Sequence, residues 1–71
     1  MGEQENVLSI PIETLEGEEM VKYYNDMMSR LDSLMLVREE KDYILVSDRK
    51  INAMVMLILD EKKNITMIRR F

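Results

Sequence analysis

Carboxylates are the most numerous side chains in this chain that could do chemistry. Fourteen Asp and Glu residues stand against ten Lys and Arg residues, a formal net charge of −4. Two clusters are dense enough to consider as a metal site or an acid–base pair: Glu16, Glu18 and Glu19, then Glu39, Glu40 and Asp42. Neither has the alternating spacing of a calcium loop, and a catalytic pair needs a cleft that raises one pKa. We interpret both clusters as solvated acids and expect no metal.

Histidine and cysteine are both absent from the sequence. The chain therefore lacks the commonest general base at neutral pH, the commonest metal ligand and any thiolate nucleophile. Its serines have no histidine to activate them, and its two glycines do not form a phosphate-binding loop. The sequence predicts a protein that is not an enzyme, uses no cofactor and has no small-molecule substrate.

Methionine is unusually frequent, with eight residues in 71. Its flexible, polarisable side chain suits a surface that must fit a partner of irregular shape. Most of the methionines fall at helical or strand spacing, which is typical of a core, but Met28 lies beside the apolar stripe of the predicted helix. We predict a group of protein-binding residues in which the charges of Glu18 and Lys22 align the partner. Tyr23 and Met28 act in this set as anchors, and Asp32 completes it.

Basic residues are concentrated in the second half of the chain. Residues 1–42 hold eleven acids and four bases, a balance of −7, and residues 43–71 hold three acids and six bases, a balance of +3. An antiparallel sheet would bring Arg49, Lys50, Arg69 and Arg70 toward one end, where they could contact phosphates. The alternative function is therefore a dimeric nucleic-acid-binding transcriptional regulator. The acidic balance of the whole chain and its four aromatic residues disfavour it.

Two periodicities in the sequence predict the secondary-structure elements that position these side chains. Residues 7–12 alternate and predict a strand, which Pro11 places at a sheet edge. Over residues 16–35, apolar side chains recur at spacings of three and four and predict an amphipathic helix. These side chains are Met20, Tyr24, Met27, Leu31, Leu34 and Met35. Three further strands are predicted at 43–47, 51–59 and 65–68, with a polar turn at 60–64.

The predicted fold class is α+β, one amphipathic helix packed on a mostly antiparallel sheet in the order β-α-β-β-β. Residues 1–6 are predicted to be a flexible acidic tail and residues 7–71 a single domain. The strand at 51–59 is apolar on both sides, with Met54, Met56 and Ile58 on one of them. Because a single helix covers one face, the second face of this strand is expected to form an interface.

The size of the chain favours self-association. A domain of this length buries only about 60% of the surface of its unfolded chain, and disulfides are excluded here. We therefore expect a homodimer. The N-terminus has neither the bases nor the apolar run of a signal peptide, and no apolar stretch approaches ~20 residues, so we expect a cytoplasmic protein that does not contact membranes. The predicted function is a small non-catalytic adaptor or inhibitor that binds another protein.

Overall fold

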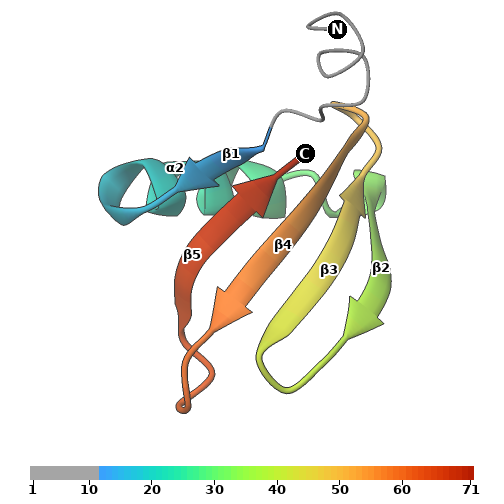
Figure 1. Cartoon of the computed structure of the whole chain (residues 1–71). Coiled ribbons are helices and arrows are strands. Elements are labelled where there is room, and N and C mark those ends of the chain that lie inside the picture. Colours follow the sequence, from blue (N-terminus) through green and yellow to red (C-terminus); the bar gives the residue numbers. More distant parts are fainter. Residues whose placement is uncertain (1–11) are drawn as a thin grey trace, which may run out of the picture.

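The computed structural model describes residues 12–71, which form one α-helix and a five-stranded antiparallel sheet (Figure 1). In chain order the elements are β1 (Glu13–Leu15), α2 (Gly17–Met28), the 3-10 helix η1 (Leu31–Ser33), β2 (Leu34–Glu39), β3 (Tyr43–Asp48), β4 (Ala53–Leu59) and β5 (Ile65–Arg70). The α+β class, with one helix on an antiparallel sheet, is confirmed. The predicted tail at 1–6, and residues 7–11 of the predicted first strand, lie outside the described residues.

The order of the strands in the sheet is β1-β5-β4-β3-β2. Strands β2 to β5 follow one another as hairpins. Each strand pairs antiparallel with the next, and such a pair can be joined by a short connection. The predicted turn at 60–64 is closed by the Asp60 carboxylate, which accepts hydrogen bonds from the backbone N–H groups of Lys62 and Asn64, both at 2.9 Å. Strand β1 adds to the far edge of β5, with Leu15 opposite Ile68.

The predicted helix over 16–35 is wrong in its second half. Helix α2 ends at Met28, where the Ser29 hydroxyl donates to the Asp26 carbonyl at 2.6 Å. After η1 the chain becomes extended, and β2 pairs with β3, with Leu36 opposite Val46. The run Leu34–Val37 is apolar at every position, so long-range pairing with β3 outweighs the helical spacing of its first residues. The sheet therefore gains a strand that was not predicted.

The start of the helix depends on a glycine. Glu16 is extended, with φ −139° and ψ 161°, and Gly17 follows with φ +60°. This left-handed conformation strains any residue with a Cβ atom, although the space around Gly17 would hold one. Gly17 therefore lets the chain leave β1 and turn directly into the helix.

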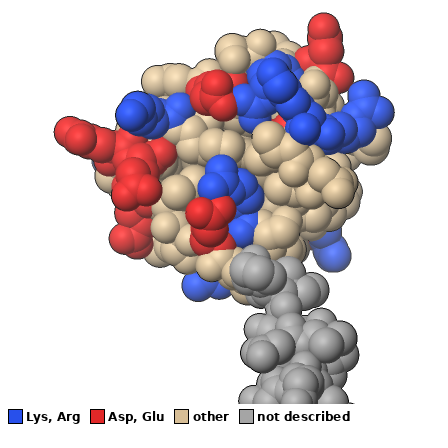
Figure 2. Space-filling model, turned by 90° about the horizontal axis from the view of Figure 1, so that it is seen from above, with Lys and Arg blue, Asp and Glu red and all other residues tan. Residues whose placement is uncertain are grey.

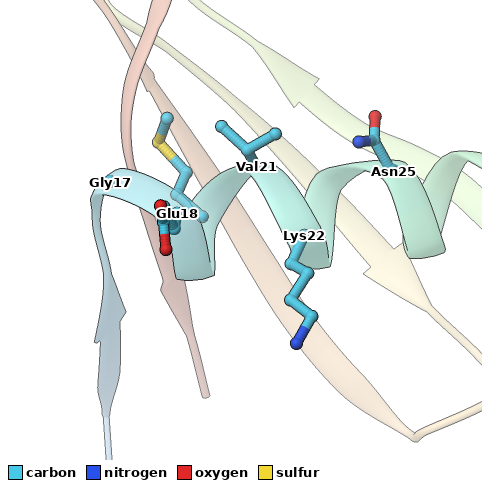
Figure 3. A pocket seen from close by; sticks show the side chains of 6 residues that line it. Gly17, Glu18, Val21, Lys22 and Asn25 are labelled. Carbon is cyan, nitrogen blue, oxygen red and sulfur yellow. The ribbon is translucent and has the colours of Figure 1, made fainter.

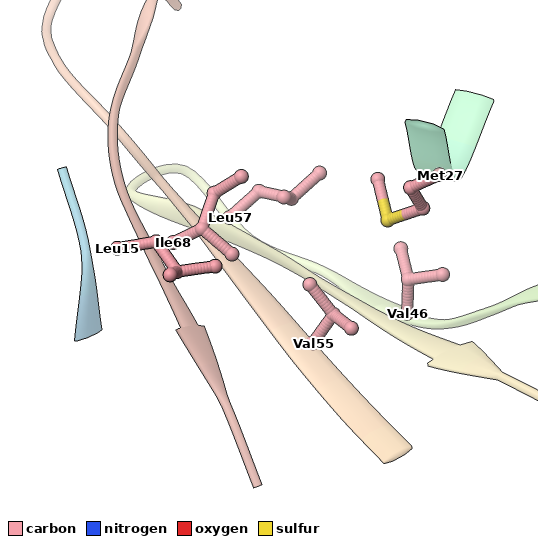
Figure 4. Close-up of a cluster of buried hydrophobic side chains, with 6 residues drawn as sticks. All are labelled: Leu15, Met27, Val46, Val55, Leu57 and Ile68. Atoms are coloured by element: carbon pink, nitrogen blue, oxygen red, sulfur yellow. The ribbon is translucent and has the colours of Figure 1, made fainter. Parts of the chain in front are cut away.

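The core lies between α2 and one face of the sheet (Figure 4). It consists of Leu15, Met27, Val46, Val55, Leu57 and Ile68, all buried. Side chains alternate along a strand, so the neighbours of these strand residues point to the opposite face. Within residues 12–71, no helix has the length and apolar content needed to cross a membrane.

Candidate protein-binding surfaces

A buried charge lies where the helix meets the sheet. The Asp48 side chain at the end of β3 has no solvent exposure. It accepts a hydrogen bond from the Tyr23 hydroxyl at 3.1 Å, and its ion pair with Arg30 places Oδ2 2.6 Å from Nη2. Arg30, whose side chain is 12% exposed, also pairs with Asp26 one turn earlier in the chain. Because a buried carboxylate needs such partners, this network fixes α2 to β3.

Tyr23 is held from a second side by the last strand. The guanidinium of Arg70 lies 4.9 Å from the centre of the Tyr23 ring, and Arg70 Nε donates to the Glu13 carboxylate at 2.8 Å. Burial, with the negative charge of Asp48, raises the pKa of Tyr23 above its ordinary value of 10, and Arg70 partly opposes this change. Tyr23 and Arg70 therefore already have partners within the chain.

The predicted protein-binding residues do not form one surface. Glu18 and Lys22 lie on the outward side of α2, beside Val21, along a shallow hollow (Figure 3). Tyr23 points from the same helix toward the sheet. Met28 is exposed at the end of α2 and Asp32 is exposed in η1. The structure thus brings Glu18 and Lys22 together and places Tyr23 in the internal network.

The predicted nucleic-acid-binding residues share one end of the sheet but not one face. Arg49 and Lys50 lie in the turn between β3 and β4, and Arg69 and Arg70 end β5 beside the start of β4. Arg69 is opposite Met56, whereas Arg70 is opposite buried Val55, so the two arginines point to opposite sides. Figure 2 shows acidic side chains gathered at the left of that view and basic ones most numerous at the upper right. The bases are therefore divided between the two faces.

The face of the sheet opposite the helix is apolar and rich in methionine. Figure 1 shows α2 behind the sheet, and no described element lies over the front. Register places these side chains on the front: Met35, Tyr43, Leu45, Met54, Met56, Ile58 and Met67. We call this set the methionine face. Most of its members are half-buried, Met35 is exposed, and none belongs to the buried core.

Two arginines border the methionine face. Arg38 on β2 lies opposite Leu45, and Arg69 on β5 lies opposite Met56. The Arg38 guanidinium pairs with Glu40 at 2.6 Å. The two-sided apolar pattern of β4 was the sequence signal for this face, although it did not indicate which of the two sides the helix would cover. The contributions of Met35 and Met67 depend on strand pairing and were not predicted.

The chain was also compared with known proteins. No family model, no curated protein and no solved structure matches it. In the part of the chain that the structure describes, no three acidic side chains are grouped closely enough to hold a metal ion. Function is therefore inferred from the surfaces described above.

Proposed function

We propose that this protein acts in the cytoplasm as a small non-catalytic adaptor or inhibitor that binds another protein through its methionine face. The observation that carries the proposal is that this apolar face, on the side of the sheet away from α2, is only half-buried and has no described element packed over it. Contiguous apolar surface of this kind is typical of interaction sites. Four methionines give the surface side chains that can change shape to fit a partner.

The chemistry of the border suggests the kind of partner. Arg69 places positive charge beside an apolar centre, whereas Arg38 is already paired with Glu40. A protein segment with an apolar stripe flanked by acids, such as an amphipathic helix, would bury the methionines and pair with Arg69. The residues expected to dominate binding are Met54, Met56 and Met67, because they lie on the adjoining strands β4 and β5.

The helix surface and the basic residues are weaker candidates for the binding site than the methionine face. Tyr23, the predicted aromatic anchor, is bound to Asp48 and lies under Arg70. Arg70, which the nucleic-acid alternative needs, is paired with Glu13. Glu18 and Lys22 stay available on the outward side of α2 and form the second surface to be tested.

The test is a capture experiment with matched surface variants. The tagged full chain is incubated with lysate of its native cells, with and without nuclease, as wild type, Met56→Glu and Val21→Glu. Val21 is an exposed apolar residue on the outward side of α2, so it controls for the added charge. Circular dichroism and thermal unfolding confirm that each variant is folded.

We expect one stoichiometric protein that survives nuclease treatment, is lost with Met56→Glu and is retained with Val21→Glu. Loss with Val21→Glu alone would move the binding site to the helix. Recovery that disappears with nuclease would contradict protein binding and favour the regulator that uses Arg49, Lys50 and Arg69.

A further inference from the structure

Strand β2 forms one edge of the sheet and is apolar along much of its length. It is the last strand in the sheet order, and within residues 12–71 it pairs with β3 alone. Met35, Leu36 and Val37 are consecutive and are 51%, 59% and 48% exposed. Edge strands are usually shortened, charged or bulged, because a free edge can pair with another chain. Here the charges and a register shift begin only after Leu36, so the first half of β2 is unprotected.

The hydrogen bonds to β3 show which backbone groups of β2 face outward. The Arg49 N–H donates to the Ser33 carbonyl at 2.8 Å, and the register continues with Leu34 opposite Asp48. Hydrogen-bonded and non-hydrogen-bonded positions alternate along an antiparallel pair. The Leu34 C=O and both backbone groups of Leu36 therefore point away from β3, toward the free edge, whereas the Leu34 N–H donates to the Leu31 carbonyl at the end of η1.

We propose that β2 pairs with β2 of a second copy of this chain, antiparallel and across a two-fold axis at Met35. In this register Leu34 lies opposite Leu36 of the second copy, so the Leu36 N–H of each copy is matched to the Leu34 C=O of the other. Leu34 and Leu36 share the helix side of the sheet, because they lie opposite Asp48 and Val46 in β3. The two Met35 side chains meet on the front, where they join the two methionine faces.

Composition favours a second copy as the occupant. Met28 and Leu31, which precede β2 in the chain, are also exposed apolar residues. The chain has no cysteine, and residues 12–71 contain six buried apolar side chains, so a core this small is stabilised by burying an edge against a second copy.

The opposite edge of the sheet is less suited to pairing. Strand β1 has three residues, and its Glu13 and Thr14 are exposed. Glu13 is already paired with Arg70. The dimer is therefore assigned to β2, and the assignment does not depend on which protein binds the methionine face.

Light scattering and sedimentation of the purified full chain test the association. We expect a dimer at tens of micromolar for wild type and for Val21→Lys, and at least tenfold weaker association for Leu36→Lys. Leu36 and Val21 are similarly exposed, at 59% and 52%, so both variants are expected to fold.

A single introduced thiol tests the register. Opposite residues at a non-hydrogen-bonded position have Cα atoms about 4.5 Å apart, which suits a disulfide. Oxidised Met35→Cys should therefore give a covalent dimer, and Val21→Cys at the same concentration should not. A wild-type monomer at tens of micromolar, an unchanged dimer with Leu36→Lys, or equal cross-linking of the two cysteine variants would overturn the proposal.

Discussion

The two faces of one sheet differ in both chemistry and exposure. Strand β4 sends Val55 and Leu57 toward the helix, where they are buried, and Met54 and Met56 toward the front, where they are half-buried. The helix side also holds the Asp48 ion pair with Arg30. The front has no helix of the described chain packed against it. One set of strands therefore carries a core and an open surface.

The residue types on the two faces indicate different roles. The covered side is dominated by Val, Ile and Leu, and the β-branched Val46, Val55 and Ile68 have few rotamers. The front is dominated by methionine, which has three rotatable bonds and fills irregular shapes. We infer that the covered face determines the fold and that the open face can adapt to a partner. The following experiments test this difference, beginning with the largest effect.

Neighbouring residues of β5 give the most direct comparison. Ile68 is fully buried beneath α2, and Met67 lies next to it on the front. Ile68→Ala should lower the free energy of unfolding by about 2–5 kcal/mol, because it removes buried methyl groups and leaves a cavity. Met67→Ala should cost less than about 1 kcal/mol, because its site can relax into solvent. Urea titration measures both values, and equal losses would contradict the difference between the faces.

The buried carboxylate should give the next largest effect. Asp48→Asn keeps the shape of the side chain but removes the charge that pairs with Arg30. We expect the free energy of unfolding to fall by about 1.5–3 kcal/mol, the usual contribution of hydrogen bonds to a charged group. Glu61→Gln, at an exposed turn position, serves as the control and should leave the urea midpoint unchanged. An unchanged midpoint for Asp48→Asn would show that the network does not hold the helix.

The sequence predicted the elements whose signal is local. The helix start, the last three strands and the two alternating apolar sets of β4 each follow from a periodicity within a few residues. Strand β2 was missed because Leu31, Leu34 and Met35 also fit helical spacing, and only pairing with β3 distinguishes the two structures.

The Asp48 network was missed for a related reason. Its partners Arg30 and Tyr23 are 18 and 25 residues away in the chain, so no local pattern connects them. The same separation explains why Tyr23 was predicted as an outward anchor. The positions of surface residues on a helix can be predicted from spacing, but their tertiary partners cannot.

Tyr23 should make stability depend on pH on the alkaline side. Its pKa is raised in the folded state, mainly by burial, so the folded protein keeps the phenol proton at a pH where the unfolded chain has lost it. The unfolded state then binds fewer protons, and stability falls as the pH rises above about 10. Tyr23→Phe should lose about 1 kcal/mol at neutral pH, because the hydrogen bond to Asp48 is gone.

The pH dependence is measured as a difference, because other tyrosines and lysines also titrate in this range. Urea midpoints of wild type and Tyr23→Phe are compared from neutral pH to above pH 10. We expect the advantage of wild type to shrink as the pH rises. A constant difference over this range would show that the Tyr23 phenol does not contribute to the loss of stability.

Methionine oxidation should also distinguish the two faces, and of these experiments it has the smallest expected effect on stability. Met35 is 51% exposed at the edge of the front, whereas Met27 is 1% exposed under the sheet. Dilute peroxide followed by peptide mass spectrometry should convert Met35 to the sulfoxide well before Met27. Equal rates under native conditions would contradict the burial of Met27, and equal rates in urea are the expected control. If β2 pairs with a second copy, Met35 should also react more slowly at concentrations where the dimer forms. If the oxidation rate of Met35 does not change with protein concentration while Met27 stays protected, the difference between the faces is supported and the proposed dimer is contradicted.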